Sequence, residues 1–143
     1  MYKLSASNQI HGTVAAVKEG AVNGVVTLDT PAGLVKADIT MEAIRELGLC
    51  EGVPATAVVN ACDVLLEVAG ASGYGYSAGN VFAGEVVSVA PGAVSSIVRV
   101  KVAGGIELTS DMERECAEAF GLQAGVAVLA VVSSSDALVA CEG

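Results

Sequence analysis

The chain carries the same sequence pattern twice, and this repeat restricts its possible folds more than any other feature. A shift of 72 positions aligns the segment GAVN at 20–23 with GAVS at 92–95, and a shift of 73 aligns LGL at 47–49 with FGL at 120–122. One inserted residue near Gly104 accounts for the change in shift. An ordered series of matches on this scale indicates two copies of one folding unit.

A segment rich in Gly and Ser separates the two copies. It runs from Ala69 to Gly75 and reads AGASGYG, a composition typical of a short flexible linker. We therefore expect domains at residues 1–69 and 76–143, joined by a linker at 70–75. Units of this size, with cores built mainly of Ala and Val, bury little area alone and are expected to need partners.

Each copy is predicted to consist of short strands and one helix. Runs such as Val22–Leu28, Leu34–Ile39 and Ala55–Val59 are rich in apolar and β-branched residues and are separated by Gly, Pro, Asn or Asp. Five strands with one helix in this length are typical of an OB-like barrel. The predicted fold class is all-β, with two tandem OB-like five-stranded β-barrels, each with one short helix.

The position of each helix is indicated by its spacing and its ends. The segment MEAIREL after Thr40 places its apolar residues on one helical face, and Thr40 is suited to cap its first turn. In the second copy, Ser110 and Glu113 have the spacing of a capping box, which predicts a helix start there. Gly48 and Gly121 are the expected helix ends.

Charge and hydropathy exclude two classes of partner. The formal net charge is −9, whereas nucleic-acid binding depends on clustered Lys and Arg. Although 53% of the residues are hydrophobic, the longest apolar stretch, around Ala124 to Val132, is far shorter than the roughly 18 residues of a spanning helix. The first residues lack the apolar segment of a secretory signal. We expect a cytoplasmic protein that binds neither nucleic acid nor membrane.

The reactive side chains do not form a pattern suited to catalysis or to metal binding. His11 is the only histidine, and Ala83 stands at the matching position, so no nucleophile with its base is indicated. None of the four cysteines is repeated in the other copy, which speaks against an inherited cation site, and a reducing cytoplasm keeps them as thiols. We expect neither an enzyme nor a metal site.

Four segments resemble the Mop domain of molbindins. They are SASN at 5–8, EGAVN at 19–23, ITMEAIRELGL at 39–49 and NACDVLLEV at 60–68. Their order and spacing, in two copies, resemble the two-Mop molybdate-binding proteins. The resemblance implies a homotrimer that forms a ring of six barrels, with molybdate or tungstate as the bound ligand at the interfaces between barrels.

The resemblance also implies which residues contact the oxyanion. They come from the first motif, from main-chain groups at the GAVN turn, and from a segment that usually reads Lys-Ala-Ser or Lys-Ala-Thr. In the first copy the matching positions are Ser5, Ser7, Asn8, Ala21, Val22, Asn23, Asn60, Ala61 and Cys62. In the second copy they are Ser77, Gly79, Asn80, Ala93, Val94, Ser95, Ser133, Ser134 and Ser135.

The chain lacks both cationic side chains that are usual in the family. Ser7 and Gly79 stand at the arginine position, and Asn60 and Ser133 stand at the lysine position. Main-chain N–H groups, hydroxyls and amides can still donate to a dianion, with about 1.5–3 kcal/mol for each bond to a charged partner. Two hypotheses remain open: an oxyanion-binding protein for intracellular storage or homeostasis, and a non-binding assembly protein that keeps the ring but has lost the ligand.

The candidate residues also have plain structural interpretations. Asn8, Asn23 and Asn80 could be turn residues, because Asn tolerates a left-handed backbone. The run Ser133–Ser135 could be a solvated strand end. The net charge is −4 for residues 1–70 and −5 for the remainder, so local donors must overcome an unfavourable overall field.

Overall fold

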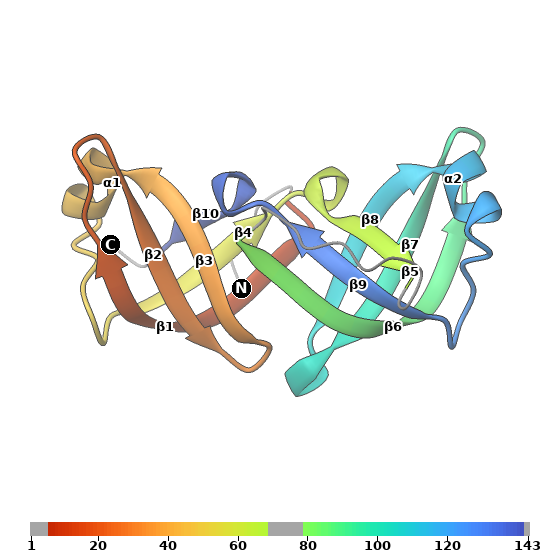
Figure 1. Ribbon diagram of the computed structural model, residues 1–143, viewed down its shortest axis with the longest axis horizontal. Helices are drawn as coiled ribbons and strands as arrows, with labels where there is room; N and C mark the ends of the chain where they lie inside the picture. Colours follow the sequence, from red (N-terminus) through yellow and green to blue (C-terminus); the bar gives the residue numbers. More distant parts are fainter. Residues whose placement is uncertain (1–5, 69–78, 142–143) are drawn as a thin grey trace.

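The computed structural model describes residues 6–68 and 79–141 (Figure 1). The first copy forms β1 (Asn8–Lys18), β2 (Asn23–Thr30), β3 (Gly33–Thr40), α1 (Met41–Glu46), β4 (Pro54–Val59), η1 (Ala61–Asp63) and β5 (Leu65–Val68). The second copy forms β6 (Asn80–Pro91), β7 (Ser95–Val102), η2 (Ala103–Gly105), β8 (Glu107–Glu113), α2 (Arg114–Ala119), β9 (Ala127–Val132), η3 (Ser134–Asp136) and β10 (Leu138–Ala140). The prediction of a mostly β protein with five strands and one short α-helix per copy is confirmed.

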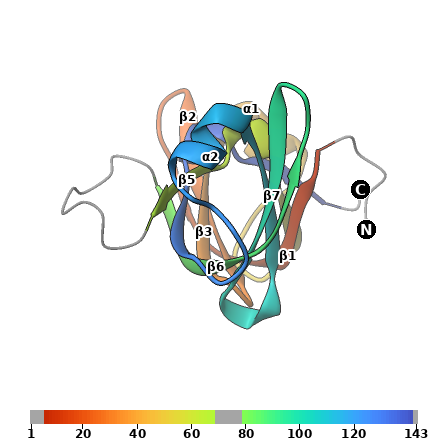
Figure 2. The same ribbon diagram turned by 90° about the vertical axis from the view of Figure 1, so that its right-hand side faces the viewer.

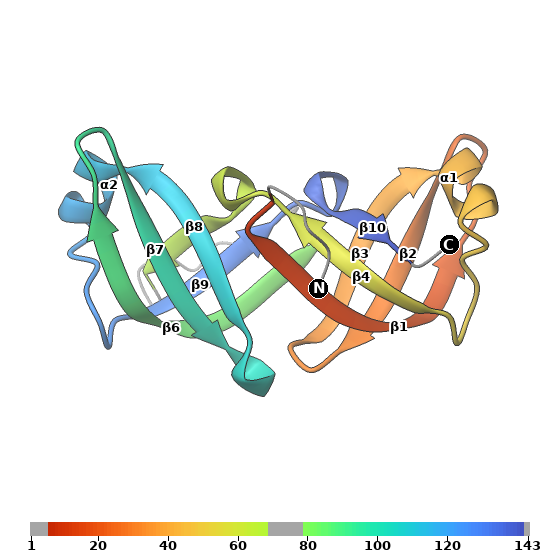
Figure 3. The ribbon, with the colours of Figure 1, turned by 180° about the vertical axis from the view of Figure 1, so that it is seen from behind.

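Two five-stranded antiparallel sheets make up the molecule, and each takes one edge strand from the other copy. The strand orders are β10-β4-β1-β2-β3 and β5-β9-β6-β7-β8. Leu138 of β10 pairs with Val58 of β4, and Leu65 of β5 pairs with Val131 of β9 (Figures 1 and 3). The limits expected from the repeat, 1–69 and 76–143, therefore describe the duplicated unit of the sequence, whereas each sheet combines strands of both copies. The expected linker at 70–75 lies outside the described residues.

The first strand of each copy is bent by a bulge at the same position. The pairing register shifts between Val14 and Ala16 in β1 and between Val86 and Ser88 in β6. An extra residue in one strand increases its local bend and twist. Each sheet curls as a result, so that β3 contacts β10 in one sheet and β8 contacts β5 in the other.

The two helices start differently. Thr40 Oγ1 accepts a hydrogen bond of 3.1 Å from the Ala43 N–H, which confirms the predicted cap of α1. Ser110 instead lies inside β8 and donates from Oγ to the Val64 carbonyl at 2.6 Å, and α2 begins after Glu113 without a side-chain cap. The predicted capping box is wrong, because the Ser110 hydroxyl satisfies a buried carbonyl of the other copy. Within the described residues, no helix has the length and apolar character needed to cross a membrane.

Glycines mark the helix ends and the inserted loop. Gly48 and Gly121 both have φ of 64°, the left-handed conformation that ends a helix, as predicted. The insertion lies in η2, where Gly104 and Gly105 have φ of 74° and 73°. A side chain at Gly104 would clash with the Pro31 carbonyl. The β7–β8 loop thus packs closely on the β2–β3 loop of the other copy.

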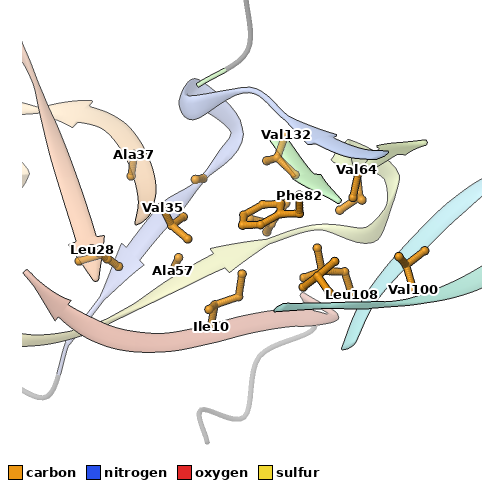
Figure 4. Close-up of a cluster of buried hydrophobic side chains, with 14 of the residues drawn as sticks. Ile10, Leu28, Val35, Ala37, Ala57, Val64, Phe82, Val100, Leu108 and Val132 are labelled. Carbon is orange, nitrogen blue, oxygen red and sulfur yellow. The ribbon is translucent and has the colours of Figure 1, made fainter. Parts of the chain in front are cut away.

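One hydrophobic core runs through both sheets. Ile10 of β1 and Phe82 of β6 occupy matching positions in the repeat, and they meet Val64, Leu108 and Val132 between the sheets (Figure 4). A cavity of about 10 Å³ remains among these side chains. It is too small and too apolar for a tetrahedral oxyanion, so the candidate site has to be sought on the surface.

Candidate functional site

In each copy, the first motif and the segment after the fourth strand lie side by side near the middle of the molecule. Asn8 pairs with Val59, directly before Asn60, and Asn80 pairs with Val132, directly before Ser133. The turns η1 and η3 are both central in Figures 1 and 3. The structure therefore brings Ser7 next to the segment 60–62, and Gly79 next to the segment 133–135. Ser5 and Ser77 lie outside the described residues.

The two GAVN-type turns lie at opposite ends of the long axis of the molecule. Val22 O accepts a hydrogen bond of 2.8 Å from Met41 N, and Val94 O accepts one of 2.9 Å from Arg114 N, so each turn lies against the start of its helix. Both hairpin tips point to the side that also carries the helices (Figure 2). Within one chain, the candidates Ala21, Val22, Asn23, Ala93, Val94 and Ser95 are not brought together with the central segments.

Asn8 and Asn80 fasten each sheet to the other. Asn8 Oδ1 accepts from Thr109 N at 2.7 Å, and its Nδ2 donates to Thr109 O at 2.9 Å. Asn80 makes the same pair with Lys36, at 2.7 and 2.8 Å. Both side chains are 2% exposed. Each amide is therefore held by two backbone groups, which leaves one N–H of its Nδ2 for any further acceptor.

The alternative interpretation of Asn8, Asn23 and Asn80 as left-handed turn residues does not hold. Among the described residues, only glycines have a positive φ. Asn23 lies at the start of β2, and its Nδ2 donates to Asp38 Oδ1 at 3.1 Å on the surface. This contact ties the hairpin to β3.

The third candidate segment differs in chemistry between the copies. In the second copy, the Ser133 and Ser135 hydroxyl oxygens are 2.9 Å apart, and Ser134 is half-buried. In the first copy, Asn60 and Cys62 are exposed and Ala61 is half-buried. One segment thus offers hydroxyl donors, whereas the other offers an amide and a thiol.

A surface cleft of about 220 Å³ joins parts of both segments. It is lined by Ala6, Val58, Asn60, Asp63, Ser135, Asp136 and Leu138. Asp63 and Asp136 are matching residues of the repeat, and their carboxylates oppose an anion in this cleft. The candidate donors Asn60 and Ser135 therefore share this cleft with two carboxylates.

Lys36, which is not among the site residues predicted from the sequence, lies beside the second copy's segment. A Cβ at Gly79 would be 2.8 Å from Ser134 Cβ and 3.7 Å from Lys36 Cβ. The only signal in the sequence is a mismatch of the repeat, because Thr109 occupies the position that corresponds to Lys36. The strand pairing and the two asparagine contacts are needed to connect Lys36 with a segment almost one hundred positions away.

Groups typical of other functions do not gather in the described part of the chain. No three His, Cys, Asp or Glu residues there are placed to hold a metal ion. His11 Nδ1 is 2.7 Å from Thr56 Oγ1, a contact between neighbouring strands.

Comparison with known proteins relates both copies to proteins of molybdenum metabolism. The profile of the TOBE domain matches residues 4–66 and 76–138. The molybdenum transport protein ModE of Herbaspirillum seropedicae is 34% identical over 142 residues, which cover 98% of this chain and 52% of that protein. Molybdenum-pterin-binding protein 3 of Clostridium pasteurianum is 41% identical over 64 residues, 44% of this chain and 94% of that protein. The chain thus spans about half the length of the ModE relative.

A solved structure is similar over the whole chain. It is the cytoplasmic molybdate-binding protein ModG, in a crystal form with molybdate bound. The TM-score is 0.94 at 38% sequence identity, and the match covers 99% of this chain and 100% of the other. The arrangement of the two sheets described above is therefore shared with a molybdate-bound protein.

Proposed function

The chain belongs to the TOBE-domain family in its tandem, Mop-type form, and on this premise we propose that it binds molybdate or a related tetrahedral oxyanion such as tungstate. The observation that carries the proposal is the likeness to molybdate-bound ModG along the entire chain. A tetrahedral oxyanion presents four acceptor oxygens, and the exposed hydroxyls and amides around η1 and η3 are suitable donors.

The binding groups are mostly neutral. Asn60 and Ser133 stand where the family usually has lysine, and Ser135 adds a second hydroxyl next to Ser133. Each hydrogen bond to the dianion contributes about 1.5–3 kcal/mol. Several such bonds hold an anion when the donors are fixed in advance by the fold. Asp63 and Asp136 weaken the attraction, so we expect moderate affinity with discrimination based on shape.

We further propose that the binding form is an assembly of chains, a homotrimer by resemblance to the family. Exposed apolar side chains recur at matching positions: Val22 and Val94 are 75% and 81% exposed, and Leu65 and Leu138 are 64% and 60% exposed. Apolar side chains that stay exposed in both copies of a repeat are suited to contacts between subunits. Such contacts are also the way in which the GAVN turns of one chain can approach the central segments of another.

Storage or homeostasis in the cytoplasm is the role that fits such a protein. An anion held between chains stabilises the assembly by about 2.7 kcal/mol per site at a hundredfold excess over its dissociation constant. The protein then fills when the oxyanion is abundant and releases it when the free concentration falls. We propose a binding role without catalysis, and a cytoplasmic location like that of the similar ModG.

One observation favours a second candidate, an assembly protein without ligand. All four positions at which the family usually has Arg or Lys are occupied here by Ser, Gly or Asn. If the neutral donors are insufficient, the ring would persist for another purpose.

Calorimetric titration of anion-free protein separates these candidates. Molybdate, tungstate and sulfate are titrated at fixed salt, and the mass of the assembly is measured in parallel. We expect saturable binding of molybdate or tungstate without comparable binding of sulfate, and a mass of three chains. An intact assembly that binds none of the three anions supports the second candidate.

A further inference from the structure

Lys36 lies beside the candidate oxyanion segment of the opposite copy. It lies on β3 of one sheet, while Gly79, Ser134 and η3 belong to the second copy. A Cβ at Gly79 would be within 3.7 Å of Lys36 Cβ, so the Lys36 side chain leaves its strand next to the space that a longer side chain at Gly79 would fill. Lys36 is thus a cation beside a segment whose side-chain donors are otherwise neutral hydroxyls.

The backbone of Lys36 is fixed, whereas its ammonium group is available. Asn80 binds both Lys36 N and Lys36 O, at 2.7 and 2.8 Å. Lys36 is exposed, and in the described part of the chain it forms no ion pair, neither with Asp38 on β3 nor with Asp136 on η3. A lysine on a fixed backbone, with a flexible four-carbon stem, is well suited to contact an anion beside it.

The same place in the other copy has no cation. Asn8 hydrogen-bonds to the backbone of Thr109 just as Asn80 hydrogen-bonds to the backbone of Lys36. Thr109 of β8 therefore lies near η1 as Lys36 of β3 lies near η3. The acidic neighbours are duplicated, because Asp111 matches Asp38 and Asp63 matches Asp136. The lysine is thus the main difference in charge between the two places, whose neutral residues also differ, with Asn60 and Cys62 in the first copy and Ser133 and Ser135 in the second.

We propose that Lys36 is the cationic contact of the oxyanion site at Gly79 and Ser133–Ser135, and that the matching site beside Thr109 is neutral. The chain therefore carries two kinds of site, a stronger and salt-sensitive one and a weaker one. This inference rests on the proposed oxyanion binding, and it adds a residue from the opposite copy to the site.

The test compares Lys36→Gln with Thr109→Lys in molybdate titrations at low and at physiological salt. Wild-type protein is expected to show two classes of site. Lys36→Gln lowers the affinity of the stronger class about ten- to hundredfold and removes most of its salt dependence. Thr109→Lys strengthens the weaker class. Lys101→Gln is the control, because it removes the same charge from an exposed position on β7, beside Glu85 and Glu107.

Anomalous scattering from molybdenum in soaked crystals supplies an independent readout. The expected result is a molybdenum peak within contact of Lys36 Nζ in the wild type. Unchanged affinity and salt dependence in Lys36→Gln, with molybdate still bound, would overturn the role of Lys36 and leave the proposed function standing. If wild-type protein binds no molybdate, both proposals are overturned together.

Discussion

The two copies of the repeat agree where they hold the molecule together and differ where the candidate sites lie. Asn8 and Asn80 make the same paired contact with the opposite sheet, and the bulge in the first strand recurs at the same position. In contrast, Lys36 and Thr109 are matching residues with different chemistry. The residues of the shared framework contact both copies, so a change in them affects both sheets. The surface segments lack such contacts and can differ between the copies.

The exchange of edge strands explains why the framework is kept. Each sheet receives an edge strand from the other copy, is bonded to the other sheet by Asn8 and Asn80, and shares one core with it. A change in one copy therefore affects the packing of the other. Surface residues such as Ser135 and Cys62 have no comparable link. The stability of variants that change one copy and leave the other intact should therefore show which contacts hold the two copies together.

The largest expected effect is at the junction of the core. Phe82→Ala removes a side chain that is 6% exposed and packs between the sheets (Figure 4). We expect the free energy of unfolding to fall by about 3–5 kcal/mol, measured by urea denaturation. Val81→Ala, at a neighbouring position that is 46% exposed, serves as control and should cost well under that. Equal losses for the two variants would show that Phe82 does not join the sheets.

Loss of either asparagine clamp comes next. Asn8→Ala or Asn80→Ala leaves a backbone N–H and C=O of the opposite sheet unpaired, and each should lower the free energy of unfolding by about 2–4 kcal/mol. Asn23→Ala, whose amide is exposed, should change it by less than about 0.5 kcal/mol. A variant at Asn8 that unfolds like the wild type but binds less molybdate would assign this residue to the ligand instead.

The hydrogen bond from Ser110 to Val64 joins the two copies on one side only, because the residue that matches Ser110 in the first copy is Ala37. Ser110→Ala leaves the buried Val64 carbonyl without its donor, and the expected loss is about 1–3 kcal/mol. Ala37 is the matching residue of the first copy and is 0% exposed, so Ala37→Ser shows whether the same contact can form on the other side. Thermal unfolding of both variants makes the comparison. No change in Ser110→Ala would contradict a stabilising role for this bond.

The smallest expected effect concerns the helix starts. Thr40→Ala removes the side-chain cap of α1 and should cost about 1 kcal/mol. Glu113→Thr places the same residue before α2, which lacks a cap, and should stabilise the protein by a similar or smaller amount. Chemical denaturation of the pair checks the prediction, and a loss of stability in Glu113→Thr would mean that Glu113 has a role the repeat does not reveal.

The sequence predicted local features well. The strands, the capped helix after Thr40 and the helix ends at Gly48 and Gly121 follow from spacing and residue type within short segments, and the structure confirms them. The capping box at Ser110 failed because a hydroxyl that fits a helix start equally fits a strand when a distant carbonyl accepts its hydrogen. The site residues taken from the resemblance remain a prediction. Within one chain, the first motif of each copy lies next to the segment after the fourth strand, whereas the GAVN-type turns lie far from both.

The amino-acid sequence was enough to predict two copies of one β-rich unit, the segments in them that form strands, and the family that they resemble. These properties depend on periodicity and on residues close together along the chain. The exchange of β5 and β10 between the sheets and the position of Lys36 beside Gly79 emerge only from the three-dimensional fold. Strands as short as β5 and β10, of 4 and 3 residues, carry too little pattern to specify an edge, so their partners are chosen by the packing of the whole core and by the path of the chain.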